Sequence, residues 1–231
     1  IKHRLGRSFP HPTMVRIAEV SGGNPLYALE LARAIDADRG GEQQVFPRSL
    51  TNLVRMRIAR LDERTLDVLL AAACVPPPTV DMLVGVTGTP VEQVVELLEQ
   101  HESAGIIALD GNRMSFTHPV LARGVYTSAT PARRRYWHRA WSKALSEPES
   151  KARHLALAAT SSDQETLDAL DAAAAVVRGR GAPAAAAELL DLAISLGGDT
   201  PLRRFAAAEH HLRSGDAARA QEVLKPGIDQ M

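Results

Sequence analysis

Residues 106–116 read IIALDGNRMSF, and this segment decides the fold of the chain. Its two apolar halves flank Asp110-Gly111-Asn112, a typical turn of a short β-hairpin. The rest of the chain is rich in alanine runs with helical periodicity, and aromatic residues make up only 4% of it. We therefore expect an all-α fold that carries one small β-hairpin.

Three helical patterns come directly before the hairpin. Asp62 can N-cap the first, a short helix over 80–86 is the second, and Pro90 begins the third, which Gly105 ends. Three helices followed by a hairpin are the order of elements in a winged helix. Together with the basic helix around 132–141, they predict a winged-helix domain over 45–147.

The third helix is acidic on its polar side. Its expected apolar stripe holds Val91, Val94, Val95 and Leu98. A recognition helix in a DNA groove would face phosphates, which acidic side chains repel. We therefore expect this winged helix to serve protein contacts or nucleotide sensing rather than DNA binding. The acidic residues are Glu92, Glu96, Glu99 and Glu102, and the helix has no Lys or Arg.

A glycine-rich turn marks the start of the chain. Gly22-Gly23-Asn24-Pro25 joins two expected helices, 12–20 and 25–37, with proline at the first helical position of the second. A polar, glycine-containing stretch, 38–44, follows as a linker. This predicts a helical segment with its linker over 1–44.

A second motif follows the hairpin. Residues 116–126 read FTHPVLARGVY and place His118 where a helix begins. A helix N-terminus offers free N–H groups, and imidazole adds a hydrogen-bond donor that titrates near neutral pH. His118 is thus a candidate anion contact. The alternative is that it only caps the wing and packs on Tyr126.

The C-terminal part contains an internal repeat. GAPAAAAELL at 181–190 aligns with GDAARAQEVL at 215–224, an offset of 34 residues, which is the tetratricopeptide period. The sequence predicts a truncated array of tetratricopeptide-like helical hairpins over 148–231. The expected last helix, 216–229, should be its least stable unit or be covered by another copy of the chain.

These motifs together resemble the centre of the large ATP-binding regulators of the LuxR family. These are switch proteins of the STAND class of AAA+ ATPases, similar to the maltose activator. The resemblance implies an AAA+ helical lid, a winged helix and tetratricopeptide-like repeats. It also implies that Gly23, Asn24, Pro25 and His118 form part of an ADP or ATP site, which a separate nucleotide-binding domain would complete. No Gly-x-x-x-x-Gly-Lys-Ser/Thr loop occurs in the chain, so we expect no tight nucleotide binding by these 231 residues alone.

The resemblance also implies the partners. The chain would couple the nucleotide state of its own NTPase domain to an inducer or protein ligand on the repeats. Promoter DNA would bind only through a C-terminal helix-turn-helix outside this sequence. We expect a cytoplasmic location and no membrane contact. Two other functions stay open at this point: a protein-binding helical scaffold without a nucleotide role and, less favoured, a winged-helix DNA binder.

Catalytic and metal-binding motifs are absent from the sequence, so we expect neither catalytic nor metal-ligating residues in this chain. The single Cys74 excludes internal disulfides and fits a reducing compartment. The remaining histidines lack ligand spacing, and we expect them in solvent or at the edge of the core. They include His101, His138, His154, His210 and His211.

Overall fold

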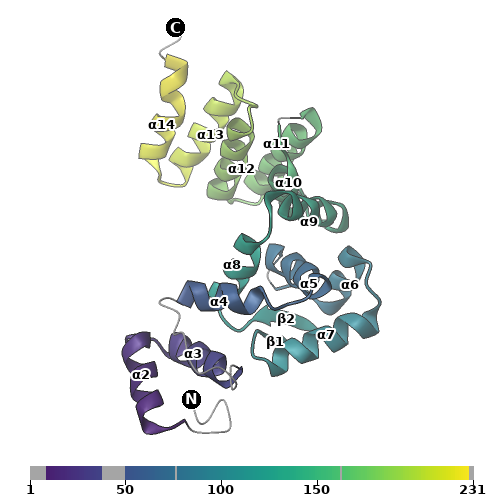
Figure 1. Ribbon diagram of the computed structural model, residues 1–231. Helices are drawn as coiled ribbons and strands as arrows, with labels where there is room; N and C mark the ends of the chain where they lie inside the picture. Colours follow the sequence, from purple (N-terminus) through teal and green to yellow (C-terminus); the bar gives the residue numbers. More distant parts are fainter. Residues whose placement is uncertain (1–8, 38–49, 76, 162, 229–231) are drawn as a thin grey trace. The chain divides into compact units, whose positions relative to one another are not determined.

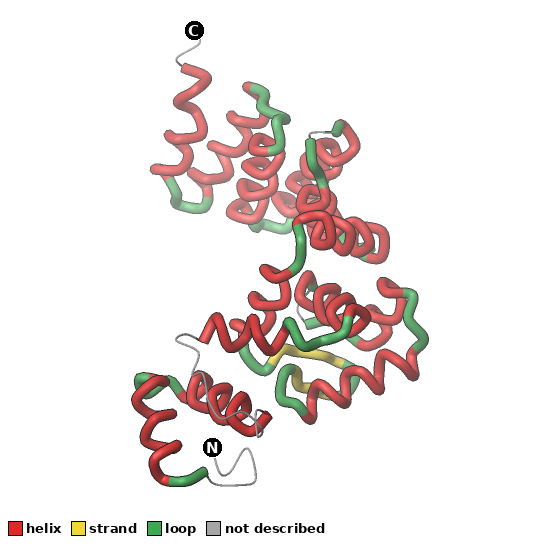
Figure 2. Tube along the Cα trace, in the orientation of Figure 1, coloured by secondary structure: helices red, strands yellow, loops and turns green. Residues whose placement is uncertain are grey.

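The computed structural model describes residues 9–37, 50–75, 77–161 and 163–228. In these ranges the chain forms 13 helices and one two-stranded antiparallel hairpin (Figure 1). Figure 2 shows how completely helix dominates, with strand confined to the hairpin. The expected all-α class with a small hairpin is confirmed. The predicted linker 38–44 lies outside the described residues.

The chain divides into two compact units, which we describe separately. The first comprises residues 1–80 and 90–129, and the second comprises 81–89 and 130–231. The predicted three-part division at 44 and 147 stays a prediction.

Helices surround a single hairpin in the first unit. Its elements are α2 (His11–Ser21), α3 (Pro25–Ala37), α4 (Leu50–Ile58), α5 (Glu63–Cys74), α7 (Val91–Ser103), β1 (Ile107–Asp110), β2 (Arg113–Phe116) and α8 (Pro119–Ser128). The helix α6 (Val80–Thr87) lies at the boundary, and most of it groups with the second unit.

The helix α3 is fixed by apolar packing on both sides. Tyr27, Leu31 and Ala32 are buried in one cluster with Ile17 of α2 and Leu53 of α4. Each of these side chains is removed from water, and the apolar area buried is the main stabilising contribution. The cluster sets the position of the Gly-Asn-Pro turn that begins α3.

Asp62 caps α5 as predicted. Its carboxylate accepts the Thr65 N–H at 2.9 Å, and hydrogen bonds from Thr65 lower the pKa of Asp62. The buried face of α5 includes Val68, Leu69 and Leu70. On α7 the predicted stripe is wrong at Val91 and Val95, which are 43% and 36% exposed. Val94, Leu97 and Leu98 face the core instead.

The hairpin pairs Ile107 with Phe116 and Asp110 with Arg113, and Met114 is fully buried. Residues before α6 extend it. The Met114 N–H donates to the Pro78 carbonyl at 2.9 Å, and the Val80 N–H donates to the Asn112 carbonyl at 2.8 Å. Thr79, directly before α6, therefore bridges to Arg113 of the hairpin through its backbone.

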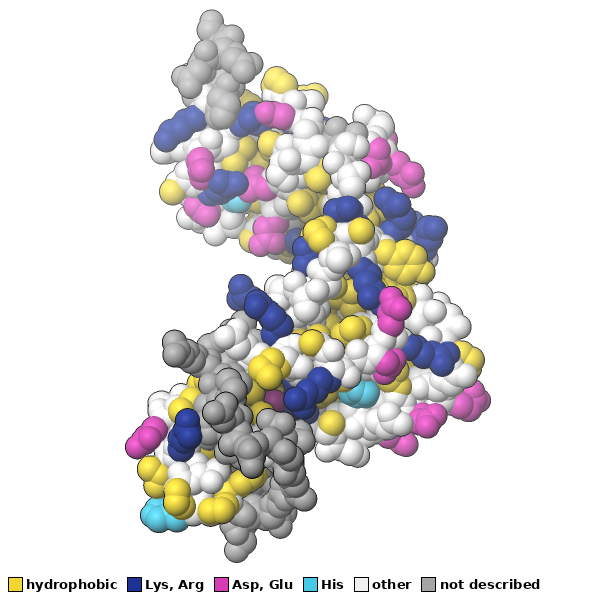
Figure 3. Space-filling view, viewed as in Figure 1, with side chains coloured by type: hydrophobic (Ala, Val, Ile, Leu, Met, Phe, Trp, Pro, Cys, Tyr) yellow, Lys and Arg dark blue, Asp and Glu magenta, His cyan; other side chains and the backbone are white. Residues whose placement is uncertain are grey.

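Consecutive helices of the second unit each pack on the next. They are α9 (Pro131–Ala144), α10 (Pro148–Ala158), α11 (Gln164–Gly179), α12 (Pro183–Ser195), α13 (Pro201–Arg213) and α14 (Ala217–Ile228). The core shared by α10 to α14 holds seven alanines and six larger aliphatic residues. Small side chains let these helices approach closely. Lys and Arg side chains gather over α9 on the face that Figure 3 shows.

The predicted 34-residue repeat appears as repeated turn geometry. Gly181 and Gly215 each follow a helix with positive φ, 79° and 89°. The Gly181 N–H donates to the Arg178 carbonyl, and the Gly215 N–H donates to the Leu212 carbonyl, each at 3.0 Å. Both turns therefore use the same hydrogen bond, 34 residues apart.

Candidate functional site

The Gly-Asn-Pro turn has a clear local structure. Gly22 and Gly23 have φ of 55° and 81°, in the left-handed region that glycine favours. The Asn24 side-chain oxygen accepts the Tyr27 N–H at 3.0 Å and so caps α3. Pro25 occupies the first helical turn and is exposed. The Asn24 side chain is thus used by the cap, whereas Pro25 presents its ring to the surface.

His118 is the N-cap of α8. Its Nδ1 accepts the Val120 N–H at 3.2 Å, and the side chain is half-buried. An Nδ1 that accepts leaves the proton of the neutral ring on Nε2. No hydrogen-bond partner of Nε2 occurs among the residues that the structure describes. His118 therefore caps α8, and this role leaves one N–H donor of its ring unused.

A cavity of about 440 Å³ is lined by residues of α3 and of the segments that flank the hairpin. Pro25 lines it, whereas Gly23, Asn24 and His118 do not. Thr117, the residue directly before His118, lines the opposite side, and its hydroxyl donates to the Gly105 carbonyl at 3.0 Å. The lining residues are Pro25, Leu26, Ala28, Leu29, Arg33, Gly105 and Thr117.

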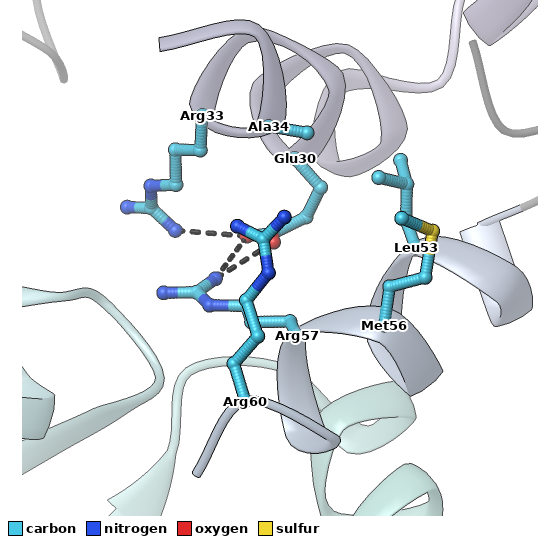
Figure 4. A pocket seen from close by; sticks show the side chains of 7 residues that line it. All are labelled: Glu30, Arg33, Ala34, Leu53, Met56, Arg57 and Arg60. Carbon is cyan, nitrogen blue, oxygen red and sulfur yellow. Dashed lines mark hydrogen bonds and ion pairs between the residues drawn. The ribbon is translucent and has the colours of Figure 1, made fainter. Parts of the chain in front are cut away.

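An ionic cluster around the buried Glu30 carboxylate includes Arg33, which also lines this cavity (Figure 4). The Glu30 carboxylate, 3% exposed, accepts from Arg33 Nη1 at 2.8 Å and from Arg57 Nη1 at 2.7 Å. Arg33 also donates to the Gly105 carbonyl at 3.4 Å, and Arg57 donates to the Ala104 carbonyl. Because a buried carboxylate needs charged or hydrogen-bonding partners, the cluster fixes α3 to α4 and to the end of α7.

Gly105 makes this arrangement possible. Its φ is 70°, and a Cβ at this position would collide with the Arg33 guanidinium. The sequence pattern predicted Gly105 only as the end of a helix, and it did not predict the ionic cluster. One signal was present, because Glu30 lies three residues after the buried Tyr27 and one before the buried Leu31. An acidic residue on an apolar helix face indicates a buried partner.

A smaller hollow of about 230 Å³ is lined by the cluster itself, through Glu30, Arg33 and Arg57. Met56 and Arg60 of the region around α4 point toward it in Figure 4, beside the Glu30 carboxylate. Arg33 lines both this hollow and the larger cavity. Arg33 is therefore the residue that the larger cavity and the smaller hollow have in common.

The histidine expectation is wrong for four positions. His138, His154, His210 and His211 are 3%, 7%, 3% and 8% exposed. His138 and His154 hydrogen-bond through their Nδ1 atoms at 2.9 Å between α9 and α10. Periodicity alone did not distinguish these from surface residues, because histidine is common in both places.

Neither the Cys74 thiol nor a metal-ligand cluster provides a reactive site in the described ranges. Burial raises the pKa of the Cys74 thiol to about 12, so that it is protonated at neutral pH and a poor nucleophile. Within the described ranges, no three His, Cys, Asp or Glu side chains gather closely enough to hold a metal ion. In the same ranges no helix has the length and apolarity to cross a membrane.

Comparison with known proteins gives no match, whether with protein-family models, with curated proteins or with solved structures.

Proposed function

We propose that this chain is the regulatory centre of a nucleotide-switched transcriptional regulator of the LuxR type. In this proposal α2 and α3 are the helical lid, and α5, α6, α7 and the hairpin form a winged helix. The helices α10–α14 are tetratricopeptide-like repeats. The chain relays the ADP or ATP state of an NTPase domain to repeats that sense a ligand. It performs no catalysis itself.

The cavity between Pro25 and Thr117 carries this proposal. Pro25 and Thr117 belong to the two motifs that suggested a nucleotide contact, and both line this cavity although they are 92 residues apart in sequence. Its volume of about 440 Å³ falls within the range of small-molecule sites, roughly 300–1,000 Å³. Leu26 and Leu29 offer apolar surface for a purine ring. The unused Nε2–H of His118, one residue beyond Thr117, is a donor for a phosphate oxygen.

A titration with adenosine and ADP tests the proposal. Because this sequence has no phosphate-binding loop, we expect weak binding of both, with amide NMR shifts around Leu26, Leu29 and Gly105. Leu29→Arg should abolish the shifts, and Val15→Arg, on exposed α2 surface, should keep them. Sub-micromolar ADP affinity, or shifts confined to other residues, would contradict the proposal.

The gene offers a second test. The proposal requires a phosphate-binding loop in the translated sequence that precedes Ile1. A reading frame without one would remove the nucleotide role.

A protein-binding scaffold is the second candidate, and α13 favours it. Leu202 and Phe205 are 83% and 72% exposed on this helix. Large apolar side chains that share one exposed region often mark a protein contact. A scaffold would bind its partner equally well with Leu29→Arg, whereas the switch would lose nucleotide control of that binding.

Direct DNA binding has less support. Glu92, Glu96, Glu99 and Glu102 of α7 are all exposed, so the face available to DNA carries negative charge.

A further inference from the structure

A hollow of about 250 Å³ lies among α11, α12 and α13 in the second unit. Leu190 and Leu202 give it apolar surface, and Leu202 is 83% exposed. Asp171, Arg178, Arg203 and His210 supply its polar groups. The hollow therefore combines an apolar surface with a small number of charged and polar side chains, as ligand sites do.

One ring nitrogen of His210 is buried without a hydrogen-bond partner among the described residues. The residue is 3% exposed, and its Nδ1 has no partner in the part of the chain that the structure describes. Its neighbour His211 shows the usual situation, because its Nε2 lies 3.2 Å from Asp191 Oδ2. Buried polar atoms without a partner are rare in folded proteins and indicate a missing water, ion or ligand.

The charges in the hollow do not cancel. Arg203 binds the Asp171 carboxylate through Nε at 2.9 Å and Nη2 at 2.8 Å, so these two charges compensate each other. The guanidinium of Arg178 has no ion pair or hydrogen-bond partner within the described ranges. One positive charge therefore remains at the hollow.

The state of the His210 ring follows from its surroundings. Burial lowers the pKa of His210. The negative charge of Glu209 opposes this shift, whereas the positive charges of Arg178 and Arg213 add to it, and the net direction is downward. The ring is thus neutral at neutral pH, with one N–H donor and one acceptor nitrogen. It can exchange a hydrogen bond with a hydroxyl group.

We propose that this hollow binds a small organic carboxylate that also carries a hydroxyl group. Its carboxylate pairs with Arg178, its hydroxyl group satisfies His210, and its apolar body packs on Leu190 and Leu202. A volume of about 250 Å³ lies just below the range of drug-sized sites, so the ligand is small. This inference deepens the proposed function, on which it rests for its biological meaning, by giving the helical repeats a class of ligand.

The test is an NMR titration of the full chain with three matched probes. We expect 4-hydroxybenzoate to bind saturably. Benzoate, which lacks the hydroxyl group, and 4-hydroxybenzamide, which lacks the charge, should each bind more weakly, the amide by about tenfold. Equal affinity for the acid and the amide, or no saturable shifts with any probe, would overturn the proposal.

Two variants and one control locate the binding. Arg178→Gln should reduce the affinity for 4-hydroxybenzoate to that for the amide. Arg180→Gln, two residues away and paired with Glu147 outside the hollow, should leave it unchanged. His210→Phe keeps the ring size, so the melting temperature should be equal or higher, yet 4-hydroxybenzoate and benzoate should then bind equally. Equal effects of the two arginine changes would contradict the site.

The carboxylate could also come from the end of a peptide. The peptide Ala-Ala-Phe and its C-terminal amide distinguish the two sources. If the free peptide binds about tenfold more tightly than 4-hydroxybenzoate, the small-molecule assignment is wrong. These titrations contain no nucleotide, so their failure leaves the cavity at Pro25 unaffected, and a failed ADP titration leaves this hollow unaffected.

Discussion

Single glycines show how closely the backbones of two helices approach. Gly124 of α8 lies against α4, where a Cβ would press into the buried side chains of Val54 and Ile58. Alanine favours helix over glycine by about 1 kcal/mol, but overpacking costs about 1–3 kcal/mol. We expect Gly124→Ala to lower the free energy of unfolding, measured by urea denaturation.

Gly85 provides the matched control for this prediction. It lies within α6, is exposed and has no atom within 4 Å of an added Cβ. Gly85→Ala should stabilise the chain by about 0.5–1 kcal/mol. If both substitutions stabilise, the close contact between α4 and α8 is not as described.

The buried Glu30 carboxylate is the other residue on which the first unit depends. Glu30→Gln leaves Arg33 and Arg57 without their shared counter-ion, and both are largely buried. We expect a loss of about 2–4 kcal/mol in the free energy of unfolding, somewhat below a fully buried pair because the arginines keep some solvent contact. Glu96→Gln on exposed α7 should change it by less than about 0.5 kcal/mol. Equal effects would show that the cluster is solvated.

The role of a residue could be predicted from the sequence where its partner lies only a few positions away. Asp62 was recognisable as a cap because its partner Thr65 is three residues away. Glu30 and Arg57 are 27 residues apart, and only the packing of α3 on α4 brings them together. Pattern analysis reaches interactions within one helical turn, whereas pairs between elements need the fold.

Among the elements, α12 tests whether alanine is required for close helix packing. Ala186 is fully buried, and Ala184 of the same helix is exposed. Ala186→Leu should cost about 1–3 kcal/mol, because the added atoms force neighbouring helices apart. Ala184→Leu should change the free energy of unfolding by less than about 0.5 kcal/mol. Circular dichroism melting of both variants is the measurement, and similar melting temperatures would contradict the packing.

The contact between α9 and α10 makes stability depend on pH. Burial, together with the nearby His154 and Arg134, lowers the pKa of His138 to about 4, and burial also lowers the pKa of His154. Between about pH 6.5 and 4 the unfolded chain therefore binds more protons than the folded one. The free energy of unfolding should therefore be highest above about pH 6.5 and should fall toward pH 4. His138 should account for about 3 kcal/mol of this loss.

Urea denaturation at a series of pH values checks this. His138→Leu should flatten the dependence in that window, whatever its effect at neutral pH, and His11→Gln on the exposed start of α2 should not. A curve for His138→Leu parallel to that of the unchanged chain would contradict the prediction.

Most elements of the candidate site could be predicted from the sequence, since proline, glycine and capping residues mark where helices begin and end. The hairpin and the turns at Gly181 and Gly215 appear where their residues indicated. The predictions of which helix faces are buried were less accurate. Val91 and Val95 fit the helical period of α7 but are exposed, because periodicity does not say which flank of a stripe the neighbouring elements cover.

For the whole molecule, charge leads to a prediction about DNA. The chain has 27 basic and 27 acidic residues, and the acidic face of α7 is exposed. Counterion release therefore offers little affinity, and we expect binding to duplex DNA no tighter than about 10⁻⁴ M at physiological salt, measured by fluorescence anisotropy. Replacing the four exposed glutamates of α7 by glutamine should strengthen it. Nanomolar affinity that depends on α7 would reverse this conclusion.

The cavity itself was only partly predictable at this scale. The sequence suggested that Pro25 and His118 contact one ligand, and the structure places Pro25 and Thr117 on one cavity. His118 turns to the backbone of α8 because a helix N-terminus needs an acceptor for its free N–H groups. Whether it also contacts a nucleotide stays a prediction.

The identical turns at Gly181 and Gly215 have a consequence for the history of the gene. The Ala182 N–H donates to the Val177 carbonyl, and 34 residues later the Asp216 N–H donates to the His211 carbonyl. A DNA segment copied between these two points would join to its neighbours with the same backbone geometry at both seams. Unequal crossing-over could therefore lengthen or shorten the array by whole units without creating a new kind of junction. Related genes that differ in length by multiples of 34 codons at this point would be its trace.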